Sequence, residues 1–360
     1  MHRFYARPAA TTAAALAGLL GLFACSDTSS SPTAPETTPP QAIGIGNVIS
    51  NRWYTKPNLP TARGHAAAAT VNGLIYLIGG HLYTPEPQGL QAAVVRETAA
   101  PMAAITEPPL RSVDVYNPDL TFSAWRRAAP LPSARSRTNG AAVIDGKIYV
   151  SGGVDSTSYT WTKTLFVYNP ATNAWTKGAD MPHRTSGGVS GVINGKLYVV
   201  TTPLSEASSG MSRMYRYDPA TGQWASLGGT IYPHYAGTGG AAGGKFYIVG
   251  GFAEKRNFGE VEEYDPATNV WTFKGRRPVE RGGAAGAMID GKLYVAGGVA
   301  NNSTTGKHEV YDPVNNIWTE RTAMLTPRYG AAAARRNGIL YVLGGMAGSA
   351  LSKANESYVP

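Results

Sequence analysis

Residues 290–318 read DGKLYVAGGVANNSTTGKHEVYDPVNNIW, and this stretch contains most of a unit that recurs along the 360-residue chain. Asp290-Gly291 suits a type I′ hairpin turn, because both central residues of that turn need positive φ. The apolar run that follows ends in Gly-Gly and predicts a strand that leads into a tight turn. Tyr311-Asp312-Pro313 then indicates a further strand that ends in an Asx-Pro turn. With the apolar run before the hairpin and the strand around Trp318, the unit predicts four short strands.

Copies of this unit occupy most of the chain. Its Trp recurs 47 to 50 residues apart, at Trp125, Trp175, Trp224, Trp271 and Trp318. Its hairpin turn recurs six times, at Asn72-Gly73, Asp145-Gly146, Asn194-Gly195, Gly243-Gly244, Asp290-Gly291 and Asn337-Gly338. Self-similarity at a fixed period is the signature of a repeat architecture. The composition agrees, because 43 Gly and 25 Pro supply turns, while 15% charged residues fall below the roughly 25% of typical domains. We therefore expect an all-β fold rather than a helical bundle.

The four strands, the period of about 50 residues and the paired glycines resemble the kelch repeat, which forms one blade of a β-propeller. The resemblance covers residues 53–360 and implies an all-β, six-bladed kelch-type β-propeller within residues 44–360. The last copy ends at Pro360 in what looks like a third strand, while Trp53 lies in an orphan fourth strand before the first copy. We therefore predict that the N-terminal strand completes the last blade, with Trp53 packed there. A ring closed in this way hides the sheet edges that otherwise promote aggregation.

Three features depart from the repeat. Blade one contains an Ala/Pro-rich insertion at about residues 81–109, which is either a functional loop or a disordered excursion. In blade three, Thr201-Thr202 replaces the paired glycines, so we expect the chain to leave that strand differently. Trp161, in a loop of blade two, is either an aromatic side chain that faces a ligand or a packed lid.

The first residues have the features of an export signal. Arg3 and Arg7 precede an apolar stretch at residues 13–24, which is too short to span a membrane. Leu22-Phe23-Ala24-Cys25 resembles the bacterial lipobox, in which the cysteine is diacylated; the alternative is an ordinary signal with an incidental cysteine. Cys25 is the only cysteine of the chain. We therefore predict a lipoprotein signal peptide at residues 1–24 and lipidation of Cys25.

Residues 25–43 contain the run SDTSSSPTAPETTPPQ, which has too few apolar side chains to form a core and predicts a semi-extended tether. We expect the protein in the bacterial cell envelope, on the periplasmic or surface side of the outer membrane, held to the membrane through its N-terminal lipid only. The formal net charge is +9, but the chain has neither a basic run nor the aromatic-basic motif of RNA-binding proteins. No nucleic-acid partner is therefore expected.

Sequence signals for catalysis and cofactors are few. The chain has no G-x-S-x-G elbow, no phosphate-binding Walker loop and no dinucleotide fingerprint, so no cofactor is expected. Four of the six histidines map to one face of the expected propeller, but they come from three different repeats and lack ligand-like spacing. We therefore expect no metal site among His65, His81, His183 and His234.

The chain that enters each inner strand predicts a binding face. An arginine occupies equivalent positions in five copies, and Tyr235 takes that place in blade four; the arginines are Arg63, Arg135, Arg184, Arg281 and Arg328. In kelch propellers this arginine often binds backbone carbonyls between blades, and the alternative is a contact with a ligand. Two residues further on, the first three copies have His, Arg and Ser, and the others have Gly. The predicted ligand-binding residues are His65, Arg137, Ser186, Tyr235, Arg281, Arg328 and Tyr329.

Such a shallow, cationic site with aromatic side chains suits an anionic sugar or an acidic peptide loop. We expect a monomeric, non-catalytic binding module for a protein partner or an anionic or neutral glycan. The alternative is a sugar mutarotase, because exported kelch propellers of the N-acetylneuraminate epimerase type are similar in compartment and blade number. Anomer exchange needs a general acid/base pair over a sugar ring. The candidates for that chemistry are Glu254 or Glu206, with Arg256 or Arg137 for the ligand's carboxylate.

Overall fold

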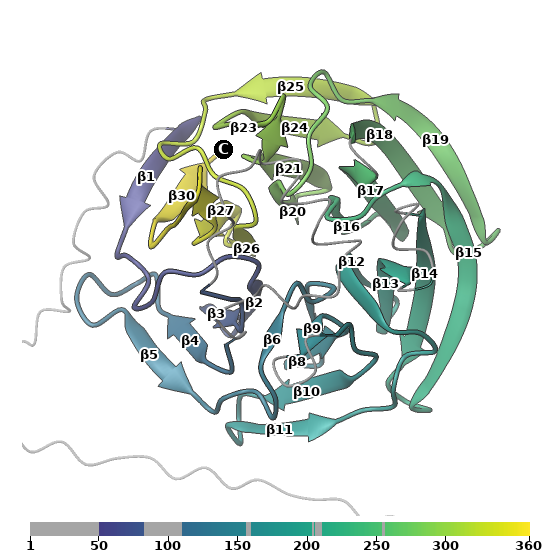
Figure 1. The fold of residues 1–360 in the computed structure, drawn as a ribbon, viewed down its shortest axis with the longest axis horizontal. Helices are drawn as coiled ribbons and strands as arrows, with labels where there is room; N and C mark the ends of the chain where they lie inside the picture. Colours follow the sequence, from purple (N-terminus) through teal and green to yellow (C-terminus); the bar gives the residue numbers. More distant parts are fainter. Residues whose placement is uncertain (1–49, 83–109, 156–159, 204, 206–210, 254–255) are drawn as a thin grey trace, which may run out of the picture. The chain divides into compact units, whose positions relative to one another are not determined.

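The structure is a computed structural model that describes residues 50–82, 110–155, 160–203, 205, 211–253 and 256–360. Six four-stranded antiparallel sheets surround a central axis as the blades of a β-propeller (Figure 1). The ranges above contain no α-helix, and therefore no helix there that is long and apolar enough to cross a membrane. The prediction of an all-β, six-bladed propeller is confirmed.

Each blade has an inner strand at the axis, and its other strands follow outward in order. From the axis outward, blade one contains β2 (Ala67–Val71), β3 (Leu74–Ile78), β4 (Val113–Tyr116) and β5 (Trp125–Ala128), and blade two contains β7 (Ala141–Ile144), β8 (Lys147–Ser151), β10 (Leu165–Asn169) and β11 (Ala174–Lys177). Blade three contains β12 (Thr185–Ile193), β13 (Lys196–Pro203), β14 (Met211–Asp218) and β15 (Gln223–Pro233), and blade four contains β16 (Thr238–Ala242), β17 (Lys245–Ala253), β18 (Arg256–Asp265) and β19 (Val270–Arg276). Blade five contains β20 (Ala285–Ile289), β21 (Lys292–Ala296), β24 (His308–Asp312) and β25 (Ile317–Arg321), and blade six contains β26 (Ala332–Arg336), β27 (Ile339–Leu343), β30 (Asn355–Val359) and β1 (Arg52–Lys56).

Three two-stranded sheets accompany blades two, five and six. In blade two, β6 (Arg135–Ser136) pairs with β9 (Val154–Asp155). In blade five, β22 (Val299–Ala300) pairs with β23 (Ser303–Thr304), and in blade six, β28 (Met346–Ala347) pairs with β29 (Ala350–Leu351). In blades five and six these pairs lie between the second and third strands, whereas in blade two β6 precedes the inner strand and β9 follows the second strand.

The first described strand closes the ring, as predicted. β1 pairs antiparallel with β30, and Trp53 lies opposite Tyr358; in Figure 1 the purple β1 lies beside the yellow β30. Trp53 is only 3% exposed, and its indole N–H donates to the carbonyl of Thr322, 2.8 Å away and directly after blade five. Blade six therefore joins the two ends of the propeller, and its outer strand also contacts blade five.

The repeated Tyr and Trp pack together within each blade and fix the contact to the blade before it. In every blade the Trp lies opposite the Tyr of the third strand, with ring centroids 4.9 to 5.3 Å apart. Five indole N–H groups also donate to a carbonyl of the preceding blade: Trp53 to Thr322, Trp125 to Pro57, Trp175 to Ala129, Trp224 to Ala179 and Trp271 to Gly228. A buried indole N–H needs such a partner. The Trp therefore joins adjacent blades.

In five of the six blades, paired glycines allow a close contact with the following blade. The second glycine donates to a carbonyl of the following blade, with N···O distances of 2.9 Å from Gly80 to Arg135 and 2.8 Å from Gly345 to Arg63. The first glycine has a positive φ, and a Cβ on Gly344 would lie 2.6 Å from the carbonyl oxygen of Arg63. Glycine is therefore required at this contact. In blade three, where threonines replace the pair, β13 continues as far as Pro203.

Candidate functional site

A ring of backbone hydrogen bonds surrounds the axis where the chain enters the inner strands. Each blade contributes one residue, and its N–H donates to the carbonyl of the ring residue in the preceding blade, with N···O distances of 2.7 to 3.0 Å. The members of this hydrogen-bonded ring are His65, Arg137, Gly187, Ala236, Gly283 and Gly330. All six have a left-handed backbone, with φ between 49° and 66°. The ring satisfies the backbone groups that would otherwise face the axis unpaired.

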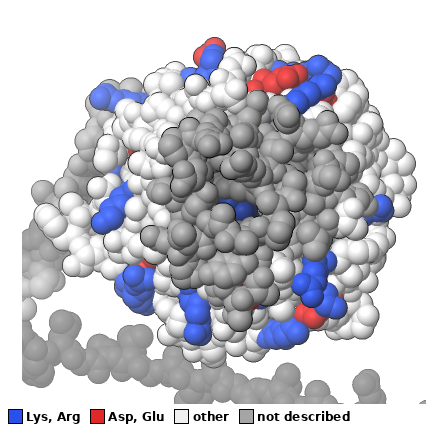
Figure 2. All heavy atoms as spheres, in the orientation of Figure 1, with Lys and Arg blue, Asp and Glu red and all other residues white. Residues whose placement is uncertain are grey.

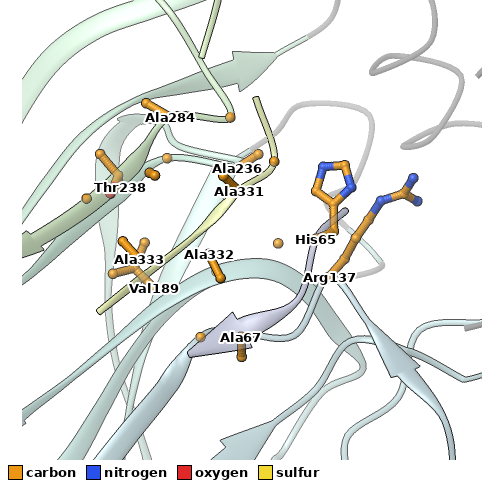
Figure 3. Close-up of a pocket in the computed structure, with 18 of the residues that line it drawn as sticks. His65, Ala67, Arg137, Val189, Ala236, Thr238, Ala284, Ala331, Ala332 and Ala333 are labelled. Carbon is orange, nitrogen blue, oxygen red and sulfur yellow. The ribbon is translucent and has the colours of Figure 1, made fainter. Parts of the chain in front are cut away.

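Two ring positions have large polar side chains despite this backbone. His65 has φ 51° and Arg137 has φ 49°, whereas three of the other positions are glycine. A side chain in the left-handed region costs about 1–3 kcal/mol, and such strain is concentrated at functional sites. Figure 3 shows the two side chains next to each other and pointing the same way, away from the alanines of the channel wall. The strained backbone thus places an imidazole and a guanidinium together at the end of the channel.

A cavity of about 200 Å³ lies along the axis at this ring. Its larger side chains are His65, Arg137, Tyr235, Phe252 and Tyr329, and the rest of its wall is mostly Gly and Ala from the inner strands. Arg137, 5% exposed, is the only charged side chain among the described residues that line the cavity, and no Asp or Glu is among them. We refer to His65, Arg137, Tyr235 and Tyr329 as the mouth.

The cavity continues into a second one of about 670 Å³ toward the hairpin turns at the other end of the axis. The two share one small residue from each inner strand: Ala68, Ala141, Ser190, Gly239, Gly286 and Ala333. Because the inner strands are rich in Gly and Ala, the side chains of the described residues do not fill the axis, and the two cavities form a channel that leads to the mouth. Small walls of this kind let a ligand approach the backbone closely.

The aromatic side chains of the mouth are held by packing against neighbouring blades. A Cβ on Gly187 would lie 2.7 Å from the ring of Tyr235, so the glycine makes room for that ring. On its other side Tyr235 stacks on Trp161, with centroids 5.8 Å apart and planes 8° apart. Trp161 is 5% exposed and packs in the same cluster as Val154. Of the two expectations for Trp161, the structure therefore favours the packed side chain.

His65 forms a pair with His81, which directly follows the glycine pair of blade one. His65 Nδ1 lies 2.9 Å from His81 Nε2, and the rings are stacked with centroids 5.1 Å apart. Burial, then Arg137, then His81 hold the pKa of His65 well below its usual value of 6.5. His65 is therefore neutral at neutral pH, beside the positive charge of Arg137.

Three of the predicted ligand-binding residues lie away from the cavity. Arg281 and Arg328 are 0% and 1% exposed and form ion pairs with Glu309 (2.8 Å) and Glu356 (2.9 Å) on the third strands of their own blades. Ser186 is fully buried and donates to the carbonyl of Arg137 at 3.0 Å. A buried guanidinium needs a carboxylate partner, which explains why these arginines stay inside the blades. The expectation that they face a ligand is corrected accordingly.

The position equivalent to Arg63 differs from the expected one in blades three and four. Counted back from the ring residues Gly187 and Ala236, it belongs to Thr185 and His234 rather than to Arg184 and Tyr235. His234 is buried, with Nε2 3.0 Å from the carboxylate of Glu262 and Nδ1 2.7 Å from the carbonyl of Gly250. A His–Glu pair thus replaces the Arg–carboxylate pair in blade four.

The candidates for acid/base chemistry do not line the cavities within the described structure. Glu206 and Glu254 lie outside the described residues, as do Cys25 and the insertion beyond Leu82. Arg256 is exposed, lies over the ring of Phe258 at 4.7 Å and approaches Glu260 at 3.9 Å. It does not line either cavity.

Sequence reasoning missed the hydrogen-bonded ring and the contact of His81 with His65. The residue after each glycine pair forms a bridge with the residue just before the ring position of its own blade, as in Gly64 with His81 and Tyr329 with Met346. The position of His81 directly after the glycine pair could therefore have predicted that it lies beside His65.

Among the described residues of the face in view, charged side chains do not form a continuous patch. In Figure 2, lysine and arginine side chains lie around the periphery of the disc, and a few acidic side chains lie beside them. One charged pair of blade five joins Lys307, just before β24, to Glu320 of β25 at 3.3 Å. The rim therefore carries scattered charge. Arg137 is the charged side chain among the described residues of the first cavity, whereas Asp290, Arg335 and Arg336 line the second.

Comparison with known proteins agrees with the architecture. A family profile described as Attractin/LZTR1 beta-propeller matches residues 110–355. Kelch-like protein 36 of Mus musculus is 28% identical over 135 residues, which cover 38% of this chain and 19% of that protein. Kelch-like protein terF of Aspergillus terreus is 31% identical over 142 residues, which cover 37% of this chain and 26% of that protein. Beta-scruin of Limulus polyphemus is 27% identical over 137 residues, which cover 38% of this chain and 13% of that protein.

These matches therefore span about a quarter or less of the relatives' own length. A solved structure titled "Structure of YjhT" superposes with a TM-score of 0.66 and 20% identity, covering 83% of this chain and 95% of that chain. At this identity the similarity concerns the fold alone. The shared fold includes nearly the whole of that other chain.

Proposed function

This chain belongs to the Attractin/LZTR1 β-propeller family, and from that membership and the geometry of the mouth we propose that it is a non-catalytic binding module. Kelch-type propellers typically bind protein partners. The ligand is a protein loop or a glycan, it binds at the mouth, and it presents an anionic group to Arg137. Fold alone does not fix function, so the residues of the mouth carry the argument.

The observation that carries the proposal is the charge of the cavity wall. Arg137 is the only charged side chain among the described residues that line it, and none of them is acidic. A guanidinium with little access to water gains most from a carboxylate, which it binds through two parallel hydrogen bonds. Tyr235 and Tyr329 add flat apolar area beside it. This combination supports an acidic sugar or an acidic peptide side chain as the group that is bound.

The test is saturation-transfer NMR of the purified protein with a panel of acidic and neutral sugars. We expect an acidic sugar to bind and Arg137→Ala to abolish the signal. Arg126→Ala removes the same charge from the exposed outer strand β5 and is the matched control, expected to bind as the wild type does. For protein ligands, a partner captured from the cell envelope has to be lost with Arg137→Ala and retained with Arg126→Ala. Binding that is equal in both variants contradicts the proposal.

The same sample also tests the alternative, a sugar mutarotase. Mutarotation requires a general acid and a general base beside the sugar ring. The candidates for that role, Glu206 and Glu254, lie outside the described residues. Anomer exchange of the bound sugar that is faster than in buffer, and is lost in Glu206→Gln or Glu254→Gln, would establish the enzyme instead.

We also propose that the protein is exported and anchored through a lipid on Cys25. The support is the positive start and apolar stretch of residues 1–24, the lipobox-like Leu22-Phe23-Ala24-Cys25 and the tether-like composition of residues 25–43. Cys25→Ala is expected to lose incorporation of labelled palmitate and to move from the membrane fraction to the soluble fraction. A variant that stays with the membrane contradicts the anchor.

A further inference from the structure

The larger of the two axial cavities has charged side chains that the proposed binding function does not use. Its volume of about 670 Å³ lies within the roughly 300–1,000 Å³ of small-molecule sites. Three charged residues line it, and one of them, Arg336, forms an ion pair with Asp119 at 2.6 Å. The other two, Asp290 and Arg335, form no ion pair or side-chain hydrogen bond with any residue that the structure describes. These two charges are therefore available to a ligand. We refer to this space as the turn-side cavity.

Arg335 is the only charged side chain at its position in the repeat. Two residues before the hairpin turn, the inner strands have Thr70, Val143, Val192, Ala241, Met288 and Arg335, and all six line the turn-side cavity. The other charge, Asp290, belongs to the turn of blade five, whose inner strand β20 lies beside β26 of blade six (Figure 1). A Cβ on Gly338, in the turn of blade six, would lie 3.9 Å from Oδ2 of Asp290. The carboxylate therefore lies against the blade that contains Arg335.

The backbone next to these two charges adds hydrogen-bonding groups. In blade five, Ile289 and Lys292 flank the two-residue turn and form a hydrogen-bonded pair of the hairpin. Such pairs alternate with pairs that are not hydrogen-bonded, so the N–H and C=O of Met288 point away from β21 and toward the axis. The same register in blade six directs the N–H and C=O of Arg335 to the axis. This wall of the cavity therefore offers donors and acceptors beside one positive and one negative side chain.

The opposite wall of the turn-side cavity is apolar at the same level. Val143 and Val192 are half-buried and line the cavity. They belong to blades two and three, which lie across the axis from blades five and six in a six-bladed ring. All charged side chains among the described residues of this cavity belong to blades five and six. The cavity therefore has a charged side and an apolar side.

We propose that the turn-side cavity binds a small zwitterion, an α-amino acid with an apolar side chain. Arg335 binds its carboxylate through two parallel hydrogen bonds, and Asp290 accepts hydrogen bonds from its ammonium group. The apolar side chain lies toward Val143 and Val192. A simple anion would meet the charge of Asp290 and a simple cation that of Arg335, so a ligand with both charges fits this pair of residues best. This binding site is separate from the mouth and goes beyond the proposed function.

The test is calorimetric titration of the purified protein with L-leucine at neutral pH and with two analogues that each lack one charged group. L-leucinol has no carboxylate, and 4-methylpentanoate has no ammonium group. We expect each analogue to bind about tenfold more weakly than leucine, or less tightly still, because it leaves one charged side chain without its partner. Glycine keeps both charged groups but has no side chain, and is also expected to bind more weakly than leucine.

Two variants identify which side chain binds which group. Arg335→Gln is expected to weaken leucine binding about tenfold or more and to abolish the preference for leucine over L-leucinol. Asp290→Asn is expected to weaken it similarly and to abolish the preference for leucine over 4-methylpentanoate. Neither change disturbs the repeat, because the position of Arg335 is uncharged in the other blades and Asn occupies the position of Asp290 in three of them: Asn72, Asn194 and Asn337.

Three control variants are expected to bind leucine as the wild type does. Asp145→Asn makes the same change in the turn of blade two, at a residue that lines neither cavity. Arg126→Gln removes an exposed arginine from the outer strand β5. Arg137→Ala removes the guanidinium of the mouth and separates this inference from the proposed function.

The outcomes distinguish the inference from its alternatives. Leucine binding that is weakened by Arg335→Gln and Asp290→Asn, but not by the three controls, supports it. Equal binding of leucine and 4-methylpentanoate, unaffected by Asp290→Asn, overturns the zwitterion and indicates a site for anions. Binding that is lost in Arg137→Ala and kept in Arg335→Gln overturns the location and assigns leucine to the mouth. No binding of leucine at millimolar concentration overturns the inference and leaves the proposed function intact.

Discussion

His308 couples protonation to the contact between blades five and six. The ring is buried against Trp53 and Tyr358, with centroids 5.2 and 4.3 Å away, and burial lowers its pKa from 6.5 to about 4. Between these values the unfolded chain binds a proton that the folded protein does not. The free energy of unfolding therefore falls as the pH falls from 6.5 toward 4, by up to about 3 kcal/mol from this residue. The lowered pKa of His65 likewise makes the free energy of unfolding fall as the pH falls below 6.5.

Urea unfolding at about pH 7 and about pH 4.5 measures this effect. His308→Gln, which cannot titrate, is expected to lose less stability over that range than the wild type. His183→Gln changes an exposed histidine and serves as the control. If His308→Gln and the wild type show the same loss, the buried imidazole is not the group that titrates.

The glycine pairs are expected to be more sensitive to substitution than the glycines of the hairpin turns. Gly297 and Gly291 have similar backbones, with φ 71° and 78°. A Cβ on Gly297 would overlap the carbonyl oxygen of Arg328 in the next blade, whereas a Cβ on Gly291 would have no neighbour within 4 Å. Gly291→Ala is expected to cost about 1 kcal/mol of stability, from the backbone alone. Gly297→Ala is expected to cost about 3 kcal/mol or more, because the blades must move apart. Equal losses in denaturant unfolding would disprove the interblade contact.

At the residue scale, sequence reasoning found the side chains of the mouth but not the backbone that places them. His65, Arg137, Tyr235 and Tyr329 were predicted and do line the cavity. The hydrogen-bonded ring was not predicted, because only three of its six members are glycine. The left-handed φ of His65, Arg137 and Ala236 is imposed by neighbours in other blades, and nothing local in the sequence indicates it.

At the scale of strands, the Trp that joins adjacent blades is expected to contribute strongly to stability. Trp271, in β19, is buried against Tyr264 and Phe246, and its indole N–H donates to Gly228 of blade three at 3.3 Å. Trp271→Ala is expected to lower the free energy of unfolding by about 3–5 kcal/mol. Trp271→Phe keeps an aromatic ring but loses the hydrogen bond, and is expected to cost less. A Trp271→Ala variant with the wild-type unfolding midpoint would contradict this packing.

The strands themselves were predictable, but their register was not in every blade. The hairpins could be predicted from the Asn-Gly and Asp-Gly turns and from the Tyr–Trp spacing, because each of these signals lies within a single repeat. In blade three, β12 begins at Thr185 and its register shifts between Ser186 and Val189. This irregularity moves the ring residue to Gly187, so aligning Arg184 with Arg63 placed the entry one residue too early. The contacts that hold β12 in this register come from other strands, and the sequence of one repeat does not reveal them.

At the scale of the whole molecule, closure of the ring by β1 is expected to protect the propeller from unfolding and aggregation. β1 supplies the outer strand of blade six, and Trp53 contacts blade five. Deletion of residues 44–56 is therefore expected to expose the edge of β30 and to yield a protein that unfolds at lower denaturant and aggregates. Deletion of residues 26–43, the predicted tether, is the control and is expected to leave the unfolding midpoint unchanged. If the 44–56 deletion stayed soluble with wild-type stability, β1 would not be needed to close the ring.

The number of blades and the closing strand followed from counting Trp residues and hairpin turns along the chain. The axial channel did not, because its width depends on six inner strands at once. Small residues such as Ala68, Gly239 and Gly286 are ordinary in single strands, yet together they leave the axis open. The cavity and its charge are thus properties of the assembled ring.

Amide chemical-shift mapping with D-glucuronate tests most directly whether ligand binds at the mouth. We expect the largest shifts on the hydrogen-bonded ring, at His65, Arg137, Gly187, Ala236, Gly283 and Gly330. We also expect these shifts to disappear in Arg137→Ala and to persist in Arg126→Ala. Shifts that concentrate on the outer strands, or that survive in Arg137→Ala, would contradict the claim.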